Sequence, residues 1–103
     1  MTLLIHTDAQ PGVLRMEGTF TFEAHSAFKA ATSGLLETHG LPAIILDLSA
    51  VSYMDSAALG MLLLIRERAE AKGQKVILSR PSPTVLTILQ VVQFGKLFEI
   101  REG

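Results

Sequence analysis

The chain has 103 residues, 49% of them hydrophobic and 18% charged, and its nine Lys and Arg against ten Asp and Glu give a net charge of −1. This composition predicts one globular domain with a hydrophobic core, and the absence of a basic field argues against nucleic-acid binding. The absence of cysteine excludes disulfides and thiolate metal sites. Since no signal peptide and no apolar run of membrane-spanning length is present, we expect a cytoplasmic protein without membrane insertion.

The chain begins with a predicted β-hairpin. Residues 3–5 and 13–16 have the composition of short strands, and Pro11 and Gly12 between them mark a turn. The alternating residues 18–22 extend the second strand or form a loop over the core.

A helix and a buried strand are predicted next. Apolar residues recur at helical spacing over residues 23–38, and Gly40 and Pro42 end that helix. Residues 43–48 form a continuous apolar run, which is typical of a central strand buried on both faces. We expect a short polar loop after this run, over residues 49–55.

The second half of the chain predicts two more helices. One runs over residues 56–72 and ends at Gly73, and a strand follows over residues 75–79. Ser82 is a suitable N-cap for the other helix, which we expect to end near Gly95. Residues 97–100 add a last strand or a helical turn.

This order, β-β-α-β-α-β-α, predicts an α/β fold. Strands separated by helices favour parallel crossovers, while the first hairpin is antiparallel. We therefore expect a mixed four- to five-stranded sheet with about four helices packed against it.

The junction of Asp55 and Ser56 carries the most information about function. Asp and Ser are favoured N-caps, so capping is the more common explanation of this pair. Both roles are compatible, because Asp55 can cap the helix while the Ser56 hydroxyl faces solvent beside the small Ala57 and Ala58. Unpaired amides and the helix dipole favour a negative group at this end, so the hydroxyl is well placed to receive a phosphate.

The helix that starts at Ser56 is apolar on more sides than one core face requires. We expect Leu59 and Leu63 to be partly exposed on a protein-binding face close to Ser56. Gly60, in the middle of this helical pattern, suggests close packing.

The sequence offers little other chemistry. His6, His25 and His39 lack metal-ligand spacing, and Asp47 is explained by local hydrogen bonding. The glycines form no nucleotide-binding motif, so we expect no cofactor and no metal. Ser56 has no nucleophile-elbow glycines around it, and a hydrolase would need His25 or His39 to approach it, so we expect no catalytic residue and no enzyme activity.

The motifs together resemble a STAS domain, the family of bacterial anti-sigma factor antagonists. The resemblance lies in Leu46-Asp47-Leu48, in Met54-Asp55-Ser56-Ala57-Ala58-Leu59-Gly60 and in Gly73 with the strand after it, and the element order extends it over residues 1–103. It implies that Ser56 is reversibly phosphorylated. The unphosphorylated form then binds an anti-sigma factor, often itself the serine kinase, and frees a sigma factor, and a serine phosphatase resets the switch.

The resemblance also implies a partner-binding face made of Asp55, Ser56, Ala57, Leu59, Gly60 and Leu63, on a monomer or weak dimer. Many family members have Ser-Gly where this chain has Ala57 and Ala58, and an acidic residue where it has Thr21. The alternative is a STAS subunit of a lipid-transport ABC complex, which packs on the transporter's ATPase without being phosphorylated.

Overall fold

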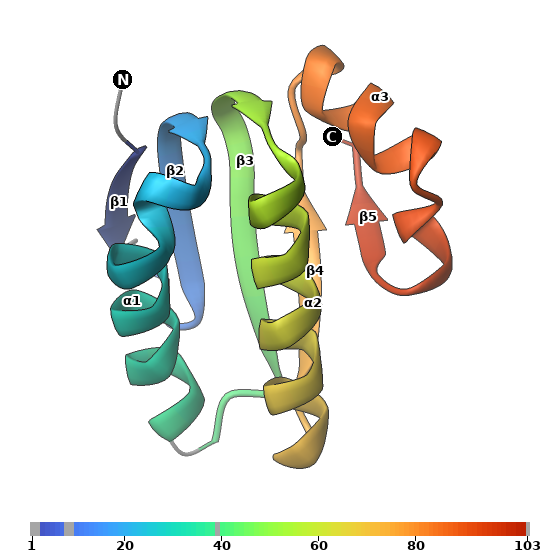
Figure 1. Cartoon of the computed structure of the whole chain (residues 1–103). Coiled ribbons are helices and arrows are strands. Elements are labelled where there is room, and N and C mark those ends of the chain that lie inside the picture. Colours follow the sequence, from blue (N-terminus) through green and yellow to red (C-terminus); the bar gives the residue numbers. More distant parts are fainter. Residues whose placement is uncertain (1–2, 8–9, 39, 103) are drawn as a thin grey trace.

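The computed structural model of the chain describes residues 3–7, 10–38 and 40–102. Figure 1 shows their arrangement, in which helices lie in front of a twisted sheet. The elements in chain order are β1 (Leu3–Thr7), β2 (Val13–Phe20), the 3₁₀ turn η1 (Phe22–Ala24), α1 (His25–Glu37), β3 (Ala43–Met54), α2 (Ser56–Ala71), β4 (Lys75–Ser79), α3 (Pro83–Val91), the 3₁₀ turn η2 (Phe94–Lys96) and β5 (Glu99–Arg101).

The sheet has five strands in the order β1-β2-β3-β4-β5, so the long strand β3 is central, as its apolar sequence predicts. β1 and β2 pair antiparallel, and every other neighbouring pair is parallel. The predicted hairpin is thereby confirmed. Its turn requires Gly12, which has a φ of +84° and lies so close to β3 that a Cβ would stand 2.9 Å from the Ala43 carbonyl oxygen.

Two expectations about the elements are corrected. The expected loop over residues 49–55 is wrong, since β3 continues to Met54 by pairing with β2 as far as Phe20. Three α-helices and two short 3₁₀ turns replace the expected four helices among the described residues. The last α-helix stops at Val91 rather than near Gly95, because Gln93 adopts a left-handed conformation with a φ of +60°.

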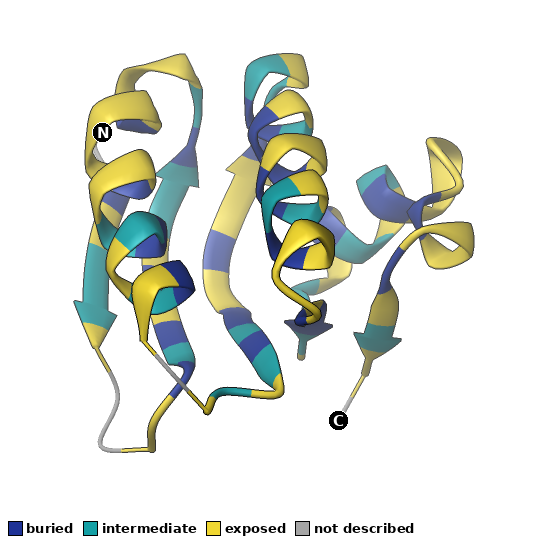
Figure 2. Cartoon of the chain, turned by 90° about the horizontal axis from the view of Figure 1, so that it is seen from below, coloured by how far each residue is buried: buried dark blue, intermediate teal, exposed yellow. Residues whose placement is uncertain are grey.

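The core lies between the sheet and the helices. Figures 1 and 2 both show α1 and α2 side by side over the same face of the sheet, and in Figure 2 the buried positions of both helices face the strands. Apolar side chains of the three central strands meet those of the helices there. The side chains that are no more than 2% exposed include Leu14, Met16, Phe20, Phe28, Ile44, Leu46, Leu48, Val51, Met54, Ala58, Leu62, Ile65, Ala69, Leu78, Val85 and Leu89.

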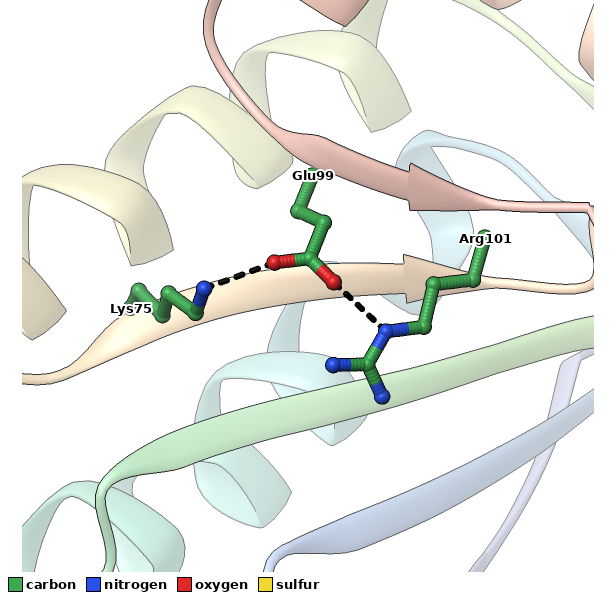
Figure 3. Close-up of polar contacts among 3 residues, drawn as sticks. All are labelled: Lys75, Glu99 and Arg101. Atoms are coloured by element: carbon green, nitrogen blue, oxygen red, sulfur yellow. Dashed lines mark hydrogen bonds and ion pairs between the residues drawn. The ribbon is translucent and has the colours of Figure 1, made fainter.

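The opposite face of the sheet carries an ion network. Lys75 of β4 donates to one carboxylate oxygen of Glu99 at 2.6 Å, and Arg101 of β5 donates to the other at 2.6 Å (Figure 3). The hydrogen bond from Lys75 and then that from Arg101 hold the pKa of Glu99 below its ordinary value. This ion network lies beside Ile77, which pairs with Glu99 in the sheet and is only 2% exposed.

In the described part of the chain, no helix is both long and apolar enough to cross a membrane.

Candidate functional site

Ser56 is the first residue of α2, directly after the central strand. Asp55, in an extended conformation, is the N-cap, and its Oδ1 accepts a hydrogen bond from the Ala58 amide at 2.8 Å. The sequence left open whether Asp55 or Ser56 caps the helix, and the structure shows that Asp55 does. The Ser56 side chain is exposed, and no described residue forms a hydrogen bond with its hydroxyl. The hydroxyl thus stands free at the positive end of the helix dipole.

Asp55 also joins α2 to the loop after β2. Its Oδ2 accepts a hydrogen bond from the Phe22 amide at 3.1 Å, and its own amide donates to the Phe20 carbonyl at 3.2 Å. These bonds span 33 and 35 positions of the chain, so the residue before Ser56 holds the loop against the start of α2. The loop and the start of α2 form one connected edge at the same end of the sheet (Figure 1).

This loop presents an aromatic side chain that the sequence reasoning did not single out. Phe22 is 71% exposed, and its ring stacks on that of His25 with 6.4 Å between the centroids. A large apolar side chain on a backbone fixed by hydrogen bonds is a suitable anchor for a protein interface. The sequence carries no signal for this exposure, because the pattern of residues 18–22 indicates an extension of the second strand or a loop over the core.

The exposed face of α2 is partly as expected. Leu63 is 39% exposed, which confirms its predicted place at the surface, and the neighbouring Leu64 is 42% exposed. Leu59 is half-buried and packs against the core, as Ala57 does, so it is partly exposed as predicted. The expected close packing at Gly60 is wrong: Gly60 is exposed, and a Cβ added there would meet nothing within 4 Å.

Asp47 makes the local hydrogen bonds that the sequence suggested, and one contact that it did not. Its Oδ1 accepts from the Ser49 amide at 3.0 Å and from the Ser49 hydroxyl at 2.7 Å, while Oδ2 pairs with the Arg80 guanidinium. Burial raises the pKa of Asp47, but the bonds from Ser49 and the pair with Arg80 outweigh it, so the pKa lies below its ordinary value. These contacts tie the end of the apolar run of β3 to Arg80, which follows β4.

Among the described residues, neither His6 nor His25 forms a hydrogen bond with Ser56. The His25 ring stacks on that of Phe22. His6 lies on the edge strand β1, which β2 separates from β3. His39 lies outside the described residues. No group of three His, Cys, Asp or Glu side chains in the described part of the chain could hold a metal ion. What this end of the molecule offers is an exposed hydroxyl among exposed apolar side chains.

Known proteins are similar to this chain in sequence. The STAS domain family model matches residues 3–103. The STAS-domain containing protein PA14_20770 of Pseudomonas aeruginosa (strain UCBPP-PA14) is 36% identical over 100 residues, which cover 97% of both chains. The anti-sigma F factor antagonist of Lysinibacillus sphaericus is 30% identical over 83 residues, which cover 81% of this chain and 71% of that protein.

Solved structures agree on the fold. The anti-sigma factor antagonist from Mycobacterium paratuberculosis superimposes with a TM-score of 0.85 at 19% identity, covering 99% of this chain and 87% of the other. The Bacillus cell fate determinant SpoIIAA in its phosphorylated form gives 0.67 at 22% identity, covering 96% and 90%. This chain therefore belongs to the family of STAS domains that includes the bacterial anti-sigma factor antagonists.

Proposed function

We propose that this chain is an anti-sigma factor antagonist switched by phosphorylation of Ser56. The unphosphorylated domain binds an anti-sigma factor, which can itself be the serine kinase, and thereby releases a sigma factor. Phosphate on Ser56 blocks that binding, and a serine phosphatase restores it. The chain acts as a binding protein rather than an enzyme, as a monomer or weak dimer.

The observation that carries this proposal is the placement of the Ser56 hydroxyl. It is exposed at the first residue of α2, while the adjacent Asp55 carboxylate is already engaged with two backbone amides. A phosphate of about −2 charges at a helix N-terminus is compatible with the fold, because unpaired amides and the helix dipole stabilise it. The same charge disturbs a partner that packs on nearby apolar side chains.

Two serines of β3, which ends at this edge of the sheet, have hydroxyls that are already hydrogen-bonded. The Ser49 hydroxyl donates to Asp47 at 2.7 Å, and the Ser52 hydroxyl donates to the Gly18 carbonyl at 3.3 Å. Ser26, in the first turn of α1, is exposed like Ser56. Ser26 is thus a matched comparison: it is also at a helix start, but it lies outside the motif that resembles the family's phosphorylation site.

The test is to map phosphate by mass spectrometry on the protein purified from its own cells, with and without phosphatase treatment. We expect one phosphate, on Ser56, that is absent from Ser56→Ala and retained in Ser26→Ala. Phosphate on Ser26, Ser33, Ser49 or Ser52 with Ser56 unmodified would refute the proposed site. Absence of phosphate together with co-purification of a transporter ATPase would instead support the role in a lipid-transport ABC complex.

The switch itself is tested by calorimetric titration against the anti-sigma partner. Ser56→Ala should bind permanently, because it cannot be phosphorylated and loses only an exposed hydroxyl. Ser56→Asp should bind more weakly than wild type, though less weakly than the phosphoprotein, since it adds one charge and fewer acceptor oxygens. Equal affinities of wild type, Ser56→Ala and Ser56→Asp would show that this position does not control binding.

A further inference from the structure

One edge of the sheet is open to pairing with a further strand. β1 is the outermost strand of the order β1-β2-β3-β4-β5, and its register with β2 runs from Leu3 to Thr7 without a bulge. All five of its residues are uncharged at neutral pH, with histidine counted as neutral. β1 therefore lacks the charges, prolines and bulges that usually prevent an edge strand from pairing through its outer N–H and C=O groups.

The opposite edge of the sheet is protected. β5 has only three residues, and two of them, Glu99 and Arg101, are charged. Both belong to the ion network with Lys75. Short and charged edge strands resist the addition of another strand, so addition is favoured at β1 rather than at β5.

The helix above β1 continues this uncharged surface. Figures 1 and 2 both show α1 over β1 and β2, and no described element lies beyond β1. Ala27 of α1 lines a hollow with Leu3 of β1, and Glu23 is the one charged residue that lines it. Ala31 and Leu35 follow Ala27 at helical spacing and pack, partly buried, against the core. The flank of α1 beside β1 thus carries no charge along this row and has small side chains at two of its three positions.

A second copy of this chain fits both parts of this flank. When two β1 strands pair antiparallel about a two-fold axis through Ile5, each Leu4 stands opposite His6 of the other copy. No like charges meet in this pairing, and Leu4, which is 53% exposed, loses exposed surface. The paired strands lie about 4.8 Å apart. The axis is perpendicular to the sheet, so the two α1 helices meet on the same side, where alanines permit a helix contact at about 8–10 Å.

We propose that this chain forms a two-fold symmetric dimer through β1 and the flank of α1 that contains Ala27, Ala31 and Leu35. The same patch is used twice, and the two five-stranded sheets become continuous. An unrelated extended peptide would gain similar backbone hydrogen bonds, but a second copy also brings a matching helix flank on the same side of the sheet. The patch is small, so we expect a weak dimer. α1 separates this flank from α2 and Ser56, so both copies keep the proposed partner face free (Figure 2).

Sedimentation velocity over a range of protein concentrations tests the dimer. Wild type should change reversibly from monomer to dimer, and Leu4→Lys should weaken dimerisation about tenfold or more, because lysine on an edge strand blocks pairing. Ala27→Arg should weaken it as well, since a long side chain keeps the two α1 helices apart. Leu64→Lys is the matched control, because it makes the same substitution at a position of α2 that is 42% exposed, and it should dimerise as wild type does. Thermal melts should show that each variant is folded.

Cysteine crosslinking tests the register of the two β1 strands. The natural chain has no cysteine, so introduced thiols report only on their own positions. A mixture of Leu4→Cys and His6→Cys proteins should form a disulfide-linked heterodimer on mild oxidation, because the two positions stand opposite each other. Either protein alone should crosslink much more slowly, since identical positions lie diagonally, about 7–8 Å apart, which is too far for a disulfide.

Three results would overturn this proposal. They are a protein that stays monomeric at millimolar concentration, equal weakening by Leu64→Lys, and crosslinking of Leu4→Cys alone as fast as that of the mixture. None of these measurements involves phosphate or an anti-sigma partner, so the dimer and the proposed switch at Ser56 can fail independently of each other.

Discussion

Replacing Asp55 by alanine tests the connection between the start of α2 and the loop that carries Phe22. The carboxylate accepts two backbone hydrogen bonds, at 2.8 Å from Ala58 and at 3.1 Å from Phe22. Loss of an N-cap costs about 1 kcal/mol, and loss of the second bond costs about 1 kcal/mol more. We therefore expect Asp55→Ala to lower the free energy of unfolding by roughly 2 kcal/mol, which corresponds to a fall in Tm of about 10 °C for a domain of this size.

Calorimetry gives the stability, and hydrogen exchange of single amides locates its cause. In Asp55→Ala the amides of Phe22 and Ala58 should both exchange faster than in wild type. Asp55→Asn, which keeps one accepting oxygen, should lose about half as much stability. Ser82→Ala is the matched control, because the Ser82 hydroxyl also forms two hydrogen bonds at a helix start. It accepts from the Val85 amide at 3.4 Å and donates to the Val51 carbonyl at 2.6 Å, and it forms no hydrogen bond with the loop that carries Phe22.

The control separates a local effect from general loss of stability. Ser82→Ala should destabilise the domain while the Phe22 amide keeps its wild-type exchange rate under conditions that favour the native state. If Asp55→Ala unfolds at the wild-type temperature, or if exchange at Phe22 does not change, then Asp55 does not hold this loop in the way inferred from the two hydrogen bonds.

The remaining predictions concern the partner face and the buried carboxylate. Leu63→Glu should fold but lose binding to the anti-sigma partner in a pull-down, whereas Leu62→Glu, at a position that is 0% exposed, should unfold in a thermal melt. Phe22→Ala should change the free energy of unfolding by less than about 0.5 kcal/mol and should weaken the partner's binding in calorimetry. Asp47→Asn should lower stability by about 2 kcal/mol at neutral pH. Because the pKa of Asp47 is lowered in the fold, its contribution is complete above the ordinary aspartate pKa of about 4 and is lost as pH falls through the lower folded value, so the melts of Asp47→Asn and wild type should converge in acid.

Most helices and strands could be predicted from the sequence, because apolar periodicity and capping residues are local features of each segment. The helix that begins at Ser56 and the central strand that begins at Ala43 follow from periodicity and capping, and both begin where the sequence predicts. The extension of β3 to Met54 could not be found this way, because Ser49 and Ser52 give that segment the composition of a loop. Its strand conformation depends on pairing with β2, a contact between distant parts of the chain.

In the candidate site, too, the local features could be predicted and the contacts between distant segments could not. The exposed Ser56 and the capping Asp55 are local features of one turn, so the sequence was sufficient to place them. The bond from Phe22 to Asp55 exists only after folding brings together two segments 33 positions apart. The structure assigns the capping of α2 to Asp55, which leaves the hydroxyl of the adjacent Ser56 free for the proposed phosphorylation.

That division of roles bears on how a phosphate at Ser56 would act. Asp55 is already held by the amides of Phe22 and Ala58, so it cannot turn away from a new dianion without giving up bonds that stabilise the fold. The repulsion between the two groups therefore remains, but both are open to water in the free domain, where it is weak. A partner that excludes this water strengthens the repulsion and must also desolvate the phosphate. An extra cost of about 3 kcal/mol is enough to reduce affinity more than a hundredfold. We therefore expect phosphorylation to change the Tm of the free domain little while abolishing the complex, and a large shift in Tm would indicate that the switch acts through the fold instead.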